Sequence, residues 1–405
     1  MHKTAKAIPD TPGGALPLVA SYITTFLKPE MHHIYRQVAN LQSYQTFVIT
    51  KTRQNAGTFP YHDVEIIPPQ RSFFDRRRLV EKHLLRKSPF FYRGEYADTL
   101  EILGRRKPDL VHVYFGHTAV ALLPLLLDTP IPVVVSFHGM DTRLRPCNNY
   151  QANLEKVFRR ADLILVRSNS LGQRLIAMGC SPEKIRLNRT GIPIEKFPWS
   201  DRVPPDDGRW KLLQACRFVE KKGLFDTLAA FQELRKRFPL AELVLAGDGP
   251  LRQALEQKIG ELGLRHCARI MEFQNQHQLC ALFHDAHVFV HPSKLTDDGN
   301  CEGIPNVILE AMSSGLPVAA TRHGGIPELL AQGHNGRLVA EGDVPGLAGA
   351  LSEILSDYDG ALEMARRGRG KLVESFAHGT QIRSLEASYT EALGRRKTHT
   401  SLAIS

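Results

Sequence analysis

The chain lacks any apolar run long enough to cross a membrane. Its densest run, Ala119–Leu127, falls well short of the roughly 20 residues that a spanning helix needs. Gly13–Leu27, behind Lys3 and Lys6, has the composition of a signal peptide, but Pro17 interrupts it and no A-x-A cleavage site follows. These absences predict a cytoplasmic protein.

Cysteine pairs and metal-binding patterns are also missing. The six cysteines show no paired spacing, which favours reduced thiols over a disulfide framework or a zinc site. Asp297, Asp298 and Asn300 lie close together but lack the glycine and distal glutamate of an EF-hand, so we interpret them as a polar loop. No G-x-G-x-x-G follows the first predicted strand, which argues against a dinucleotide oxidoreductase. We therefore expect no metal and no bound cofactor.

The charge is unbalanced, with a net +10. A basic protein favours nucleic acid, anionic lipid or phosphate-bearing ligands, and the absence of zinc-finger spacing or an RNP-like string makes nucleic acid the weakest of these. Arg71–Arg93 holds eight Lys or Arg against two acids, interleaved with aromatic residues. This segment fits either a face that contacts an anionic membrane or a basic helix with its aromatic side chains in the core.

The apolar pattern indicates parallel α/β architecture. Leu16–Tyr22 and Tyr44–Lys51 are predicted strands with a helix between them over Glu30–Leu41. Asp109–Phe115 and Pro132–His138 are further buried strands. We expect a chain this long to hold two doubly wound α/β domains, joined by a linker rich in Pro and Asp at residues 201–208.

The most informative stretch is Cys301–Leu330. Pro305 suits the first position of a helix over Asn306–Ser314, and Leu316–Thr321 is predicted to be a buried strand. Backbone N–H groups at such a helix start favour an anion, here those around Gly303, Ile304 and Asn306.

Two glutamates bracket this helix start. If the stretch were helical throughout, Glu302 and Glu310 would lie about 12 Å apart. That is too far for a shared proton or metal, but it suits two carboxylates that accept hydroxyls at opposite ends of an extended ligand. The spacing alone also fits a capped helix with solvated glutamates.

Polar residues follow other predicted strands. His138-Gly139-Met140-Asp141 comes directly after one strand, and His117 follows the strand before it. Ligands of open α/β sheets bind at the carboxyl ends of strands, although an isolated histidine there more often has only a structural role. Arg217 and Lys222 bracket a loop after a strand over Lys211–Cys216, where two cations suit a diphosphate or are ordinary surface charge.

The whole Cys301–Leu330 string resembles the donor-site signature of the retaining glycosyltransferases of family 4, a large group with the GT-B fold. Their motif E-G-x-P-x-x-x-x-E-A-M-x-x-G-x-P-V matches here at Glu302, Gly303, Pro305, Glu310, Ala311, Met312, Gly315, Pro317 and Val318. The DDGNCEGIPN lead-in and the HGGIPEL tail are most similar to the branch that builds bacterial exopolysaccharides and colanic acid.

The resemblance implies two Rossmann-like domains that face a cleft. Residues 1–200 would be the acceptor-side domain and residues 201–377 the donor-binding domain, with a helix over 378–395 packing back on the first. The family string G-R-L-x-x-x-K-G implies that Arg217 and Lys222 hold the donor diphosphate, with Cys216 at the position of the family's glycine.

Further roles follow from the same resemblance. Glu302 would orient the donor sugar, Glu310 would accept hydrogen bonds from the ribose, and the stretch Gly303–Asn306 would line the donor site. The family's H-G-x-D string places His138 at the sugar-transfer centre, with Asp141, His117, Thr25 and Gly14 as cleft or acceptor candidates.

The resemblance thus implies a metal-independent retaining enzyme, which is either cytoplasmic or peripheral on the inner face of the cytoplasmic membrane. It would move sugar from a nucleotide-diphosphate sugar to a glycan or lipid-linked acceptor in polysaccharide biosynthesis. A nucleotide-sugar epimerase and an inactive membrane scaffold remain as alternatives, and the sequence names neither nucleotide, sugar nor linkage.

Overall fold

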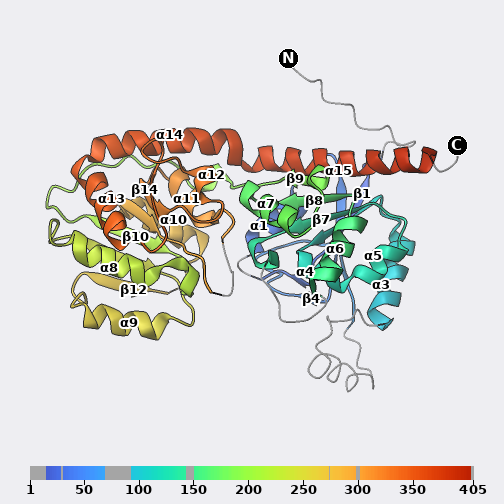
Figure 1. The fold of residues 1–405 in the computed structure, drawn as a ribbon, viewed down its shortest axis with the longest axis horizontal. Coiled ribbons are helices and arrows are strands. Elements are labelled where there is room, and N and C mark those ends of the chain that lie inside the picture. The colour runs from blue at the N-terminus through green and yellow to red at the C-terminus, as the bar shows by residue number, and fades with distance from the viewer. Residues whose placement is uncertain are drawn as a thin grey trace, which may run out of the picture. The chain divides into compact units, whose positions relative to one another are not determined.

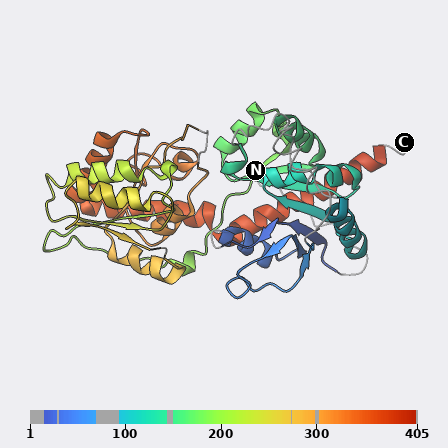
Figure 2. The ribbon, with the colours of Figure 1, turned by 90° about the horizontal axis from the view of Figure 1, so that it is seen from below.

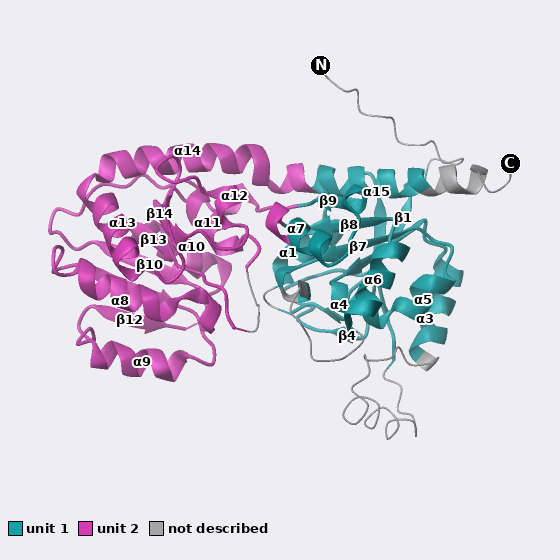
Figure 3. Ribbon diagram, viewed as in Figure 1, with its two compact units in different colours: residues 1–167, 172–188, 382–405 teal, residues 168–171, 189–381 magenta. Residues whose placement is uncertain are grey.

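The computed structural model describes residues 15–28, 31–68, 93–142, 150–272, 274–297 and 302–402. The chain divides into two compact units (Figure 3). Unit 1 comprises residues 1–167, 172–188 and 382–405, and unit 2 comprises residues 168–171 and 189–381.

Unit 1 is built on a parallel sheet in the order β5-β3-β1-β6-β7-β8-β9 (Figure 1). Buried runs of Val, Ile and Leu form its central strands, as expected for a sheet covered on both faces. The strands are β1 (Leu18–Tyr22), β3 (Gln45–Thr50), β5 (Val64–Ile66), β6 (Leu110–Tyr114), β7 (Val133–Phe137), β8 (Leu163–Val166) and β9 (Ile185–Leu187). A separate parallel pair joins β2 (Thr25–Phe26) to β4 (Thr52–Arg53).

Helices cover both faces of this sheet. Because side chains alternate along a strand, Val19, Leu110 and Val134 share one face, and there they pack with Leu385 and Tyr389 of the last helix. Phe137 points to the other face, where its ring meets Phe158. The helices are α1 (His32–Ala39), α3 (Arg93–Arg106), α4 (Gly116–Ala121), α5 (Leu123–Asp128), α6 (Tyr150–Arg160), α7 (Asn169–Ala177) and α15 (His378–Leu402).

Polar contacts fix α15 to unit 1 in addition to its apolar face. The Glu386 carboxylate accepts the N–H groups of Gln42 at 2.5 Å and Ser43 at 2.7 Å. The Tyr389 hydroxyl lies 2.7 Å from Nδ1 of the buried His112. The stretch of α15 that carries Leu385, Glu386 and Tyr389 is therefore an integral part of the core of unit 1.

Unit 2 repeats the architecture with the strand order β12-β11-β10-β13-β14-β15. Its strands are β10 (Lys211–Ala215), β11 (Glu242–Ala246), β12 (Ala268–Met271), β13 (Val288–His291), β14 (Val318–Thr321) and β15 (Arg337–Val339). Its helices are α8 (Leu224–Leu234), α9 (Arg252–Glu261), α10 (Gln276–Asp285), α11 (Asn306–Ser313), α12 (Ile326–Leu329), α13 (Val344–Ser356) and α14 (Tyr358–Phe376).

Two apolar clusters fill the two faces of the unit-2 sheet. Leu212, Val288 and Val290 pack with α8, α9 and α13, whereas Leu213, Phe289 and Val318 pack with α10 and α11. Figure 2 shows α8 and α9 on one side of these strands and α10 on the other. Each unit is thus an independent three-layer α/β sandwich, and the expected doubly wound fold is present twice.

The boundary between the two units lies earlier in the chain than the sequence indicates. The predicted boundary followed residue 200, but unit 2 takes over at Arg189. Ile192 and Phe197 belong to the unit-2 core, which explains the shift. At the other end, the His378 N–H donates to the Ile192 carbonyl at 3.0 Å, so the start of α15 stays with unit 2 and unit 1 resumes at Ile382.

None of the helices within the described residues has the length and apolar character needed to span a bilayer. Cys180, Cys216, Cys267 and Cys280 carry free thiols. Burial raises the pKa of the Cys216 thiol to about 12, so this side chain is a neutral part of the interior.

Candidate active site

The strand order of unit 2 creates a place for a ligand. The chain leaves β10 toward β11 on one side and returns to β13 on the other, so the carboxyl ends of β10 and β13 flank a topological switch point. The loop with Arg217 and Lys222 follows β10, and Pro292–Lys294 follow β13. Two segments distant in sequence therefore meet at one edge of the sheet.

Glu302 lies among the cations of this edge. Its Oε1 is 2.7 Å from Nζ of Lys222 and 3.3 Å from Nζ of Lys221. The Glu302 side chain is only 11% exposed, and burial alone would raise its pKa, but the two lysines outweigh burial and lower the pKa to about 2. Glu302 is thus a fully ionised carboxylate, a hydrogen-bond acceptor at any physiological pH.

Sequence reasoning missed two further members of this cluster. Lys221 pairs with Glu302 alongside the predicted Lys222. His291, at the end of β13, is fully buried and stacks on Phe289, and both of its ring nitrogens lack a hydrogen-bond partner within the described residues. Burial, followed by the charge of Lys222, lowers the pKa of His291 well below its usual range. Its ring is therefore neutral beside the charged pair.

The backbone around Glu302 is held from the loop after β14. The Glu302 N–H donates to Nε2 of His323 at 2.9 Å, and the Gly325 N–H donates to the Gly303 carbonyl at 3.0 Å. Gly324 has φ +54°, and a Cβ at this position would stand 2.2 Å from the Glu302 carbonyl oxygen. Only glycine permits this approach.

The helix that follows begins at Asn306, as predicted. Pro305 is the N-cap of α11 rather than its first residue, and Asn306 takes that place. Among the described residues no side chain caps this end, so the first N–H groups of the helix are available to an anion. Gly303, Asn306 and Glu310 are partly exposed, whereas Ile304 and Pro305 are buried. Because Glu302 precedes the helix, the two glutamates do not share one helical face.

Arg217 differs from the lysines. It is exposed, and within the described part of the chain its guanidinium has no partner. The turn beside it is tightly packed, because a Cβ on Gly247 would stand 1.9 Å from the Cys216 carbonyl oxygen, and the Phe218 N–H donates to the Asp248 carbonyl at 2.8 Å. The Gly247–Pro250 turn is thus structural.

In unit 1, the predicted HGMD residues form a second polar cluster. Asp141 is buried, and its Oδ2 accepts the His138 N–H at 2.9 Å. Its Oδ1 accepts the His117 N–H at 3.2 Å and lies 2.9 Å from Nδ1 of His117. Asp141 thus fixes both histidines at the carboxyl ends of β6 and β7, which explains the H-G-x-D spacing.

His138 has neighbours that no local pattern indicates. Its ring lies 5.3 Å from that of His33 on α1 and 4.4 Å from Phe115. Arg167 comes directly after β8, as His138 comes directly after β7. Because Phe137 of β7 pairs with Val166 of β8, these two residues follow paired positions. Burial, followed by the charge of Arg167, lowers the pKa of His138 well below its usual range and that of His33 to about 3. Both rings are neutral at physiological pH.

Two protein families match the chain in sequence. Residues 42–196 match the Glycosyltransferase Family 4 domain, and residues 195–371 match the Glycosyl transferases group 1 domain. The amylovoran biosynthesis glycosyltransferase AmsK of Erwinia amylovora is 31% identical over 291 residues, which are 70% of this chain and 71% of AmsK. The chain belongs to the family 4 glycosyltransferases.

Other relatives agree with this family assignment. A protein of Escherichia coli named as a colanic acid biosynthesis glycosyltransferase, WcaL, is 34% identical over 264 residues, 64% of each chain. The match thus spans less than two thirds of WcaL. In structure, Anabaena HepE in complex with UDP aligns with a TM-score of 0.73 at 19% identity, covering 93% of this chain and all of HepE. This likeness shows that the fold is GT-B.

The remaining predicted residues of this family 4 chain are scattered or outside the described ranges. Thr25 lies in β2, and the neighbouring Thr24 hydroxyl is 3.2 Å from that of Thr118 in α4. Gly14 lies outside the described residues, as does all of Arg71–Arg93 except Arg93 at the start of α3. Across the described ranges, no group of three or more His, Cys, Asp or Glu side chains is arranged to hold a metal ion.

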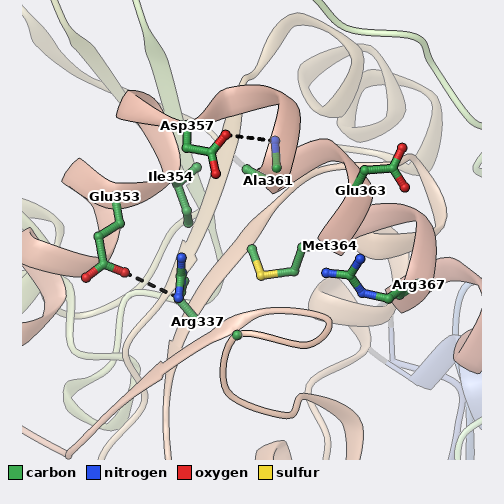
Figure 4. A pocket seen from close by; sticks show the side chains of 10 residues that line it. Arg337, Glu353, Ile354, Asp357, Ala361, Glu363, Met364 and Arg367 are labelled. Carbon is green, nitrogen blue, oxygen red and sulfur yellow. Dashed lines mark hydrogen bonds and ion pairs between the residues drawn. The ribbon is translucent and has the colours of Figure 1, made fainter.

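A pocket of about 280 Å³ lies elsewhere in unit 2, between α13, α14 and β15 (Figure 4). Its charged groups are already engaged, since Arg337 lies 3.3 Å from Glu353 and Arg367 donates to the His334 carbonyl. Asp357 caps α14. Family 4 signature residues do not line this pocket, so we place the active-site candidate at the Glu302 cluster instead.

Proposed function

We propose that this chain is a retaining glycosyltransferase that moves a sugar from a nucleotide-diphosphate sugar to a glycan or lipid-linked acceptor in cell-surface polysaccharide biosynthesis. The supporting observation is the buried carboxylate of Glu302 paired with Lys222 and Lys221 at the switch point of unit 2. A solvated signature glutamate would show neither the burial nor the two short ion pairs.

The cations of this edge suit a donor diphosphate. Arg217 is exposed, has no partner among the described residues, and offers a planar fork that binds phosphate oxygens bidentately. Lys222 and Lys221 add two point charges nearby. As the bond from sugar to phosphate breaks, negative charge grows on the departing nucleotide, and these fixed cations stabilise it. They supply this stabilisation without a metal ion.

The two glutamates then recognise hydroxyls. Glu302 is ionised at any working pH, so it accepts hydrogen bonds from the donor sugar and orients it. Glu310 lies in α11, and there it accepts the ribose hydroxyls. The first turn of α11 contributes N–H groups to the phosphates.

We propose that His138, in unit 1, takes part in sugar transfer. Because its ring is neutral, it donates or accepts a hydrogen bond without adding charge. Asp141 holds its backbone and keeps the cluster in place. In this proposal the acceptor attacks from the face that the nucleotide leaves, so the anomeric configuration is retained without an enzyme nucleophile.

The relatives indicate which substrates to try first. AmsK and WcaL are named for amylovoran and colanic acid biosynthesis, and HepE has been crystallised with UDP and with UDP-glucose. Polysaccharide intermediates and UDP-sugars are therefore the first acceptors and donors to test. We also propose that the protein works at the inner membrane face, with Arg71–Arg93 toward anionic lipid.

A donor-turnover assay tests the proposal. Purified protein is incubated with a panel of sugar nucleotides, with and without a lipid extract of polysaccharide-producing bacteria, and both nucleotide release and sugar transfer are measured. We expect transfer that needs acceptor and is lost in Lys222→Ala but kept in Lys236→Ala, an exposed lysine of the same unit. Nucleotide release without acceptor and with an isomerised sugar would indicate an epimerase, and no turnover of any donor would indicate an inactive scaffold.

A further inference from the structure

His323 connects the signature glutamate to a part of the sheet that the family motif does not include. Glu302 stands in a stretch without its own secondary structure, ahead of α11, so no helix or strand fixes its backbone. The hydrogen bond from its N–H to Nε2 of His323, at 2.9 Å, takes that place. His323 lies two residues after the end of β14.

This hydrogen bond determines the state of the imidazole. A backbone N–H can only donate, so Nε2 of His323 must be the unprotonated, accepting nitrogen. The ring proton is then on Nδ1, which lies 2.6 Å from Oε1 of Glu341 and donates to it. The carboxylate thus holds the one tautomer that can accept from Glu302.

Glu341 is itself anchored on a third segment. Its Oε2 accepts the Leu295 N–H at 2.7 Å, so the carboxylate bridges the loop after β15 and the loop after β13. The segments after β13, β14 and β15 are thereby linked by hydrogen bonds to the backbone amide of Glu302. On the other side of Glu302, Gly325 donates to the Gly303 carbonyl and Gly324 packs against the Glu302 carbonyl.

Glu302 is consequently held at both ends. Its side chain is fixed by Lys222 and Lys221, and its backbone by His323. His323 is only 2% exposed, so a ligand cannot reach its ring. An effect of His323 on catalysis is therefore indirect, and its hydrogen bond to the Glu302 N–H is the direct link to the signature glutamate.

We propose that His323 and Glu341 are a positioning pair, in which Glu341 sets the tautomer of His323 and His323 sets the place of Glu302 against the donor sugar. This proposal rests on the proposed function for its catalytic consequence, but the hydrogen bond itself can be tested without turnover. A misplacement of about 1 Å costs roughly a hundredfold in rate when the displaced group orients the reacting partner.

Two amide variants separate positioning from simple packing. His323→Gln places its carboxamide oxygen near the former Nε2 and can still accept the Glu302 N–H, whereas His323→Asn reaches only the former Nδ1 side, toward Glu341. We expect Gln to keep kcat within about threefold of wild type and Asn to lose about tenfold to a hundredfold, with the donor KM little changed in both. Similarly, Glu341→Gln keeps an acceptor for Nδ1–H and should retain more activity than Glu341→Ala.

A higher kcat for His323→Asn than for His323→Gln would overturn the proposal. If Asn is as active as Gln, or if the losses in kcat follow the losses in melting temperature, the His323–Glu341 pair only stabilises the fold. The comparison of the two His323 variants holds if both have the wild-type unfolding midpoint, measured by tryptophan fluorescence. If His323→Asn has a lower midpoint, the activities of Glu341→Gln and Glu341→Ala are compared instead and decide the proposal.

Hydrogen exchange at the Glu302 amide gives a readout that does not depend on activity. We expect slow exchange in wild type and His323→Gln and faster exchange in His323→Asn. Equal exchange in all three would refute the positioning pair even if the chain proved to be a glycosyltransferase. Conversely, the expected exchange pattern with no turnover of any donor would refute the proposed function and leave the hydrogen bond established.

Discussion

Replacing Glu302 by glutamine has a stability cost that the structure allows us to work out. The lysines lower the pKa of Glu302 from 4.5 to about 2, and at about 1.4 kcal/mol per pKa unit this corresponds to about 3 kcal/mol of stability at neutral pH. Because the folded pKa is the lower one, the contribution is complete above about pH 4.5 and is lost as pH falls toward 2. At pH 3.5 it should be about 2 kcal/mol.

Urea unfolding followed by tryptophan fluorescence is the assay. Both tryptophans of the chain, Trp199 and Trp210, belong to unit 2, so their signal reports the unit that contains Glu302. We expect Glu302→Gln to lose about 3 kcal/mol at pH 7, and this loss should shrink as the pH is lowered.

Glu233→Gln is the matched control. Its carboxylate also pairs with a lysine, Lys236, at 2.6 Å, but the two side chains are 48% and 70% exposed. Such a pair contributes less than about 0.5 kcal/mol, and the control should show no more. An unfolding midpoint for Glu302→Gln equal to wild type at pH 7, or a difference that does not change with pH, would refute the argument that Glu302 is a buried, ion-paired carboxylate.

Three further predictions follow from the same contacts. Arg217→Ala should cut turnover by about a hundredfold without changing the unfolding midpoint, because its guanidinium has no partner within the described residues. Lys222→Ala should lose both activity and stability, because it breaks the ion pair with Glu302. Equal unfolding midpoints for the two variants would contradict this distinction. Asp141→Asn should lower kcat at least about tenfold with nucleotide affinity unchanged, because it disturbs His117 and His138 in unit 1; unchanged kcat at saturating donor would be the contrary result. Glu386→Ala should destabilise unit 1 by about 2 kcal/mol, because two backbone N–H groups lose their acceptor. The unfolding midpoint should fall when it is followed by circular dichroism but not when it is followed by tryptophan fluorescence. A lower midpoint in the tryptophan signal would contradict the assignment of this contact to unit 1.

Most of the fold was predictable from the sequence, because both units repeat the same alternation of buried strands and helices. Buried strands such as Asp109–Phe115 and Pro132–His138 were predicted within a residue of β6 and β7. The unit boundary was displaced because Ile192 and Phe197 resemble linker residues locally, and only packing shows that they complete the unit-2 core.

The candidate site was predictable where each of its residues belongs to a recognisable motif. Glu302 and Lys222 were chosen from separate strings, and the structure places them 2.7 Å apart. His323, Glu341 and His291 were not chosen, because each lies at the end of a different strand and only the strand order brings them to one edge. Lys221 was missed since nothing in the sequence distinguishes its direction from that of any surface lysine.

The central claim, that the Glu302 cluster binds a nucleotide-diphosphate sugar, is tested most directly by the thermal shift of the purified protein with UDP, GDP, ADP and their sugars in the absence of metal. A ligand that binds only the folded state raises the melting temperature by mass action. We predict a clear shift with one nucleotide class in wild type, absent in Glu310→Ala and present in Glu233→Gln. A well-folded sample that shows no shift with any of these nucleotides, or a shift that survives in Glu310→Ala, would contradict the assignment of the donor site.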